Sequence, residues 1–155
     1  MSCDQGTSSE VVDNAYAHLT IKSRQLTPEE MVELVGVEPE SQWRLGDEAS
    51  YGPKRTLHTY HGIKYRSRLD ESVGGEDHLD DLIDFIREHK MALARLTEHD
   101  AVESALLGLW SFSTYGLQSF SLSPADLELL GDLNVGLWIV CSWDSVAPDA
   151  WRSDA

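Results

Sequence analysis

Five carboxylates between residues 77 and 88 are the side chains of this sequence best placed to act together. They recur at intervals of three and four residues, which places them on one face of a helix. Such a face can be a solvated surface whose first turn favours acidic residues, or a docking surface that imitates phosphates and covers a basic active site. Close charge pairs across an interface can contribute about 1.5–7 kcal/mol. We call this set the acidic ridge; its members are Asp77, Asp80, Asp81, Asp84 and Glu88.

Cations are concentrated in a different segment, from Ser50 to Leu69, which contains no acidic residue. The run from Ile63 to Leu69 alternates with the period of a strand and places its cations on one face. These cations could bind an anion, or they could neutralise acids on a neighbouring element. The basic residues of the segment are Lys54, Arg55, Lys64, Arg66 and Arg68, and the anion site that we consider consists of Lys64, Arg66, Arg68 and His61.

Histidines and serines give little support for a metal centre or an active site. His58 and His61 lie three residues apart, but no carboxylate or thiol stands at a familiar ligand spacing, and the nearby cations would repel a divalent ion. The sequence has no nucleophile elbow and no glycine-rich phosphate loop. We therefore expect no metal, no cofactor and no enzymatic activity.

Composition and charge limit the possible partners. The chain has 155 residues, 41% of them hydrophobic, which is typical of one globular domain. Its formal charge of −15 disfavours direct binding to nucleic acid. No apolar run is long enough to span a membrane, and the polar start predicts a cytoplasmic protein. Cys3 and Cys141 form no disulfide framework, and we expect Cys141 to be a small buried residue.

Two similar helix starts organise the elements that must position these groups. Thr27-Pro28-Glu29-Glu30 and Ser123-Pro124-Ala125-Asp126 each combine a capping hydroxyl, a proline at the first helical position and early carboxylates. The first helix is predicted over Pro28 to Val35 and ends at Gly36. The second is predicted to run to about Gly131.

Strand patterns flank both helix starts. We predict strands over residues 12–21, 63–69, 102–112, 119–122 and 135–142, and one long helix over residues 77–97. This order predicts an α+β two-layer sandwich, with a mainly antiparallel sheet covered on one face by helices and two pseudo-duplicated strand-helix-strand halves. Residues 1–10 are predicted to be a flexible tail, residues 11–143 a single domain and residues 144–155 a loose tail.

The segment from Leu26 to Asp47 resembles a bacterial family of domains of unknown function, DUF4279. The resemblance lies in the Thr-Pro-Glu-Glu cap, the turn at Leu34-Val35-Gly36-Val37-Glu38-Pro39 and Gly46-Asp47 after Trp43. Later segments agree in order, so that it covers about residues 12–143; Tyr65 stands where we expect the family to have tryptophan. The resemblance implies a small cytoplasmic bacterial domain without recognised catalytic residues.

We therefore predict a non-enzymatic protein-binding module, similar by analogy to bacterial immunity proteins that neutralise a toxin. It would use the acidic ridge to occlude a cognate basic protein. The alternative is a regulatory domain, or a weak enzyme, that binds a small ligand or an anion through the basic segment. A homodimer is a further option: an exposed edge strand, or Trp143 and Trp151, could join two copies. Trp110 and Trp138 are expected in the core.

Overall fold

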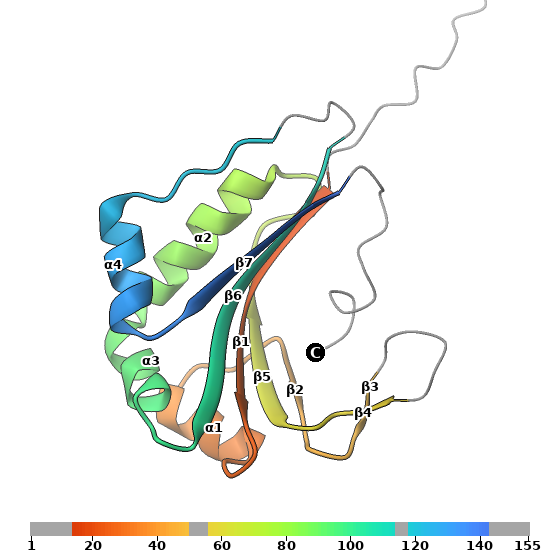
Figure 1. Cartoon of the computed structure of the whole chain (residues 1–155), viewed down its shortest axis with the longest axis vertical. Coiled ribbons are helices and arrows are strands. Elements are labelled where there is room, and N and C mark those ends of the chain that lie inside the picture. Colours follow the sequence, from red (N-terminus) through yellow and green to blue (C-terminus); the bar gives the residue numbers. More distant parts are fainter. Residues whose placement is uncertain (1–13, 50–55, 114–117, 143–155) are drawn as a thin grey trace, which may run out of the picture.

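The structure, a computed structural model, describes residues 14–49, 56–113 and 118–142. Within these ranges a five-stranded sheet forms one layer and helices cover one of its faces (Figure 1). The strands of the sheet are β1 (Asn14–Ser23), β2 (Ser41–Trp43), β5 (His61–Arg66), β6 (Val102–Phe112) and β7 (Gly136–Ser142); a separate small hairpin pairs β3 (Glu48–Ala49) with β4 (Thr56–Leu57).

The sheet has the strand order β2-β5-β1-β6-β7, with β1 at its centre. β1 pairs antiparallel with both β5 and β6, and β2 pairs antiparallel with β5. Only the pair of β6 and β7 is parallel within the described sheet. The predicted α+β fold with a mainly antiparallel sheet is therefore confirmed.

Both predicted helix starts are confirmed in detail. α1 (Pro28–Val35) begins at Thr27, whose hydroxyl accepts from the amide of Glu30, while the Glu30 carboxylate accepts from the amide of Thr27. α4 (Pro124–Asp132) begins with the same reciprocal bonds between Ser123 and Asp126. Each pair satisfies two backbone donors that a helix start leaves without partners.

The two strand-helix-strand halves share a direction but differ in spacing. β1 and β2 are both antiparallel to β5, so the strand after α1 runs parallel to the strand before it. The same is true of β6 and β7 on either side of α4. In the first half, however, β5 lies between the two parallel strands, whereas β6 and β7 are neighbours.

The single helix predicted over residues 77–97 is wrong, because the segment forms two helices. α2 (Gly75–Glu88) and α3 (Lys90–Thr97) are separated by His89, whose φ of −108° and ψ of 19° leave the helical region. The change of direction allows α3 to bury Leu93 and Leu96 while contacting α1.

The main core lies between the helix layer and the sheet. Odd-numbered residues of β1, β5 and β6 point towards the helices. The apolar face of α2 covers those of β1 and β6, and α1 packs on β5. Fully buried members include Leu19, Ile21, Ile63, Leu79, Leu82, Ile86, Leu107 and Leu109. The exposed face of α2, which bears the acidic ridge, is thereby fixed on the outside of the molecule.

Three local predictions are wrong. The strand expected over residues 119–122 is absent, and Cys141 and Trp138 are exposed rather than buried, because β7 lies at the edge of the sheet. Trp110, on the inner strand β6, is 2% exposed and confirms its prediction. Both predicted tails, and with them Cys3, Trp143 and Trp151, lie outside the described residues, as do Lys54 and Arg55.

Candidate functional site

The acidic ridge lies on the solvent side of α2. Asp77, Asp80, Asp84 and Glu88 are exposed, whereas Asp81 is only partly exposed. Asp77, Asp81, Asp84 and Glu88 form one continuous stripe, because four-, three- and four-residue steps return to the same side of a helix. Asp80 lies beside this stripe.

Asp81 is held by Arg68, a residue that the sequence had assigned to the basic segment. The backbone amide of Arg68 donates to Asp81 at 2.8 Å and its guanidinium donates at 3.0 Å. Burial opposes ionisation of Asp81, but these bonds outweigh it and hold the pKa of the carboxyl below its usual value. Asp81 therefore links the chain after β5 to α2, and its charge is already matched.

Asp80 has the opposite environment. Partial burial and the nearby carboxylates, with Glu76 and Asp126 ahead of the rest, raise the pKa of Asp80 above its usual value. Arg87 is the cation beside this group, and it donates to Asp84 at 3.2 Å and to Asp126 of α4 at 2.7 Å. The neighbouring carboxylates still raise the pKa of Asp80 in the presence of Arg87. A basic partner would relieve this repulsion between carboxylates.

Three members of the ridge, Asp77, Asp80 and Glu88, make no ion pair within the part of the chain that the structure describes. Asp81 and Asp84 do, with Arg68 and Arg87. The structure thus divides the five predicted residues into two that are internally matched and three that present charge to solvent.

The basic segment does not converge on one site. Lys64 and Arg66 point to the face of the sheet that the helices leave uncovered, since the intervening Ile63 and Tyr65 belong to the main core. Arg68 lies beyond the end of β5 and turns to α2. The ring nitrogen Nδ1 of His61 accepts from the amide of Leu45 at 3.0 Å.

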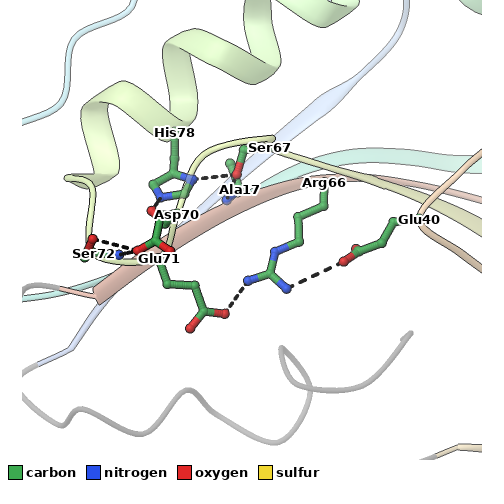
Figure 2. A network of polar contacts seen from close by, with 8 residues as sticks. All are labelled: Ala17, Glu40, Arg66, Ser67, Asp70, Glu71, Ser72 and His78. Atoms are coloured by element: carbon green, nitrogen blue, oxygen red, sulfur yellow. Dashed lines mark hydrogen bonds and ion pairs between the residues drawn. The ribbon is translucent and has the colours of Figure 1, made fainter.

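Arg66 is surrounded by groups that match its charge. Its guanidinium lies between two carboxylates, that of Glu71 and that of Glu40 at 3.6 Å, as Figure 2 shows. It also covers the ring of Tyr16 at 4.5 Å from the centroid. The two carboxylates neutralise Arg66 within the chain, and the ring contact adds a cation–π attraction.

A buried polar network that the sequence did not reveal joins β5 to the start of α2 (Figure 2). The Ser67 hydroxyl accepts from the amide of Ala17 at 3.1 Å and lies 2.6 Å from Nδ1 of His78. Nε2 of His78 lies 3.0 Å from the carbonyl oxygen of Asp70. A carbonyl can only accept, so Nε2 carries the proton and Nδ1 accepts from Ser67.

This serine and histidine have the spacing of a nucleophile and its base, but their burial indicates a structural role. His78 is fully buried and Ser67 is 6% exposed. Burial, the largest influence, lowers the pKa of His78 and keeps its ring neutral. The network joins the turn at Asp70 to the sheet and so fixes where α2 begins.

The face of the sheet opposite the helices carries a second set of polar groups. His18 and Thr20 are buried on β1, and Nδ1 of His18 lies 3.0 Å from the Thr20 hydroxyl. Burial and the cations of Lys64, Arg66 and Lys22 lower the pKa of His18 to about 3. Tyr16, Trp110 and Phe112 form an aromatic cluster on the same face.

A pocket of about 330 Å³ lies between the loop after α1, the end of β5 and the end of α2. Tyr65, Phe85 and His89 follow one another along its wall, with ring centroids 5.2 and 4.7 Å apart. Its size falls within the range of small-molecule sites. The charged residues that line it are Glu38, Glu40, Arg66 and Arg68.

Two further features are absent from the described ranges. There, no three His, Cys, Asp or Glu side chains are grouped so that they could hold a metal ion. No helix in these ranges has the length and apolar character required to cross a membrane.

The fold and these surfaces define a class: an α+β two-layer domain with an acidic helix layer, whose described serine-histidine pair is buried. The chain belongs to the DUF4279 family, a domain of unknown function, whose family model matches residues 13–142. This confirms the resemblance drawn from the helix caps and strand patterns. No curated protein and no solved structure matches the chain.

Proposed function

We propose that this chain is a non-enzymatic module that binds a basic protein through the acidic ridge. The observation that carries the proposal is the crowding of carboxylates around Asp80: partial burial first, and then the carboxylates of α2 and α4, raise the pKa of this exposed residue. A cationic surface placed against Asp80 would lower the energy of the whole group.

The manner of action is occlusion of a cationic site on the partner. Rigid support favours this action, because the residues opposite the ridge are fully buried in the main core. A partner would meet carboxylates whose backbone positions on α2 are already set, so little backbone ordering is required. The module would act in the cytoplasm and neutralise a toxin, as an immunity protein does.

Reversing the three unmatched carboxylates is expected to abolish binding. The triple variant Asp77→Lys, Asp80→Lys and Glu88→Lys leaves the Asp81 and Asp84 ion pairs in place and should preserve the fold. Loss of one close charge pair would already weaken binding about tenfold or more. The measurement is affinity capture of tagged protein from the native lysate, eluted over a salt gradient and identified by mass spectrometry.

The matched control replaces three exposed acids elsewhere, Glu33, Glu98 and Asp100, with lysine, and it changes the net charge by the same amount. The proposal requires one basic protein that wild type and control capture and the ridge variant does not. Equal capture by all three proteins would refute the ridge, and capture lost in both variants would indicate attraction by net charge alone.

The second candidate is an anion-binding regulatory domain that would use Arg66 and Arg68 in the pocket beside α2, where Glu38 and Glu40 offset their charge. Inorganic phosphate and succinate are the probes, with sodium chloride at equal ionic strength as reference. A bound anion should raise the melting temperature as its concentration rises. Arg68→Gln should remove the rise, while Arg95→Gln, an exposed change on α3, should retain it. A rise equal to that in sodium chloride would exclude this candidate.

A further inference from the structure

The two guanidiniums that line the pocket at the end of α2 are already matched by carboxylates of the chain. Arg66 lies between Glu71 and Glu40, as Figure 2 shows, and Arg68 pairs with Asp81 at 3.0 Å. An anion that entered the pocket would have to compete with these carboxylates. The positive charge of the pocket is therefore used within the chain.

Two carboxylates at the pocket are not matched in this way. Glu38 lines the pocket, and Glu88 directly precedes His89, another lining residue. Neither Glu38 nor Glu88 makes an ion pair within the part of the chain that the structure describes. Burial first, and then the charge of Glu38, raise the pKa of Tyr65, so this carboxylate acts on the wall of the pocket. The surplus charge at the pocket is negative.

Aromatic rings form one wall of the pocket. Tyr65, Phe85 and His89 line it in succession, and Tyr65 is fixed by the hydrogen bond that its hydroxyl donates to the carbonyl oxygen of Val37 at 2.9 Å. Aromatic faces attract cations. Arginine suits such a wall better than lysine, because its planar guanidinium stacks on rings and also pairs with carboxylates through two hydrogen bonds.

We propose that this pocket holds a guanidinium group, which the basic partner supplies as an arginine side chain. The inference rests on the proposed function, because the pocket adjoins one end of the acidic ridge: Arg68 in its wall binds Asp81, and Glu88 is next to His89. A partner that covers the ridge would insert one arginine more deeply than its other cations. Such an anchor would fix the position of the partner along α2.

A titration of the isotope-labelled full chain, followed by NMR, tests the pocket without the partner. The probe is N-acetyl-arginine methylamide, and its neutral isostere N-acetyl-citrulline methylamide is the reference at equal ionic strength. The arginine probe should shift the amide signals of Glu38, Phe85 and His89 and reach saturation, whereas the citrulline probe should not. Glu38→Gln and Phe85→Leu should each weaken binding about threefold. Glu98→Gln removes an exposed acid that does not line the pocket and should bind as wild type does.

Three results would overturn the pocket and leave the ridge untouched. The first is the absence of saturable shifts, or equal shifts with both probes. The second is unchanged affinity in Glu38→Gln and Phe85→Leu, with circular dichroism showing that both variants are folded. The third is a phosphate-dependent rise in melting temperature that Arg68→Gln removes, because the pocket would then favour an anion.

The role of the partner is tested separately, with the captured basic protein. Glu38→Gln should release it at lower salt than wild type does. Asp77→Lys with Asp80→Lys alters the ridge at the other end of α2, and it should weaken capture but keep the arginine probe bound. Release of the partner from Glu38→Gln at the wild-type salt concentration overturns the inserted arginine. Failure to capture any basic protein refutes the proposed function and the partner's role with it, whereas the probe still decides the preference of the pocket.

Discussion

Gly62→Ala is expected to destabilise this protein by about 3 kcal/mol, with a fall in melting temperature of roughly 10 °C. A Cβ at this position would lie 2.1 Å from Cζ2 of Trp43. Trp43 is 4% exposed and stacks on His58 at 5.1 Å, so its ring has little freedom to move aside. Urea unfolding followed by circular dichroism measures the loss.

A control and a rescue separate this clash from a general effect of losing glycine. Gly131 lies in α4 with nothing within 4 Å of its added Cβ, so Gly131→Ala should be neutral or stabilise by up to about 1 kcal/mol. In a Trp43→Ala background, Gly62→Ala should cost almost nothing, because the opposing ring is gone. Equal costs of Gly62→Ala in both backgrounds would refute the explanation.

Acid should destabilise the fold through His18, by about 2 kcal/mol between pH 7 and pH 5. The pKa of His18 is about 3 in the folded protein and near 6.5 when unfolded. Below pH 6.5 His18 therefore binds a proton in the unfolded chain but remains neutral in the folded chain. Stability is lost at about 1.4 kcal/mol per pH unit until the folded pKa is reached.

Comparing variants isolates this contribution from the titration of the carboxylates. His18→Gln cannot bind the proton in either state, so its loss of unfolding free energy between pH 7 and pH 5 should be smaller by about 2 kcal/mol. A His18→Gln slope equal to that of wild type would contradict the assignment.

Local patterns were sufficient to predict most of the elements. The caps at Thr27 and Ser123 depend on side chains within three residues, and β6 has the predicted bounds because its neighbours along the chain set its pattern. His89 is different. The helical spacing of apolar residues continues across His89 from α2 into α3. The sequence pattern therefore does not show that the helix ends there and that the two helices bury different surfaces.

The position of a strand within the sheet could not be predicted from its own residues. β7 contains Trp138 and Cys141, which suit a buried strand, yet it lies at an edge and both are exposed. β6 has a similar composition, and its place between two strands buries Trp110. Whether a strand is buried depends on which strands pair with it, and this pairing is decided by the whole chain rather than by the residues of the strand.

The candidate site was predicted in position but not in its pairing. The spacing of α2 placed the acidic ridge on one face, but alternation grouped Arg68 with Lys64 and Arg66. Since β5 ends at Arg66, that alternation no longer applies at Arg68, which reaches Asp81 instead. The bond between Ser67 and His78 was also hidden, because Ser67 lies among apolar residues of the same strand pattern.

The central place of β1 has a consequence for the order in which the chain can fold during its synthesis. β1 pairs Ser23 with Val102 and Asn14 with Phe112, so one of its two edges has no partner until most of the domain has been made. Contacts so distant along the chain slow folding. A nascent chain that ends before residue 102 would therefore expose the unpaired backbone edge of β1 and need protection from aggregation until β6 emerges.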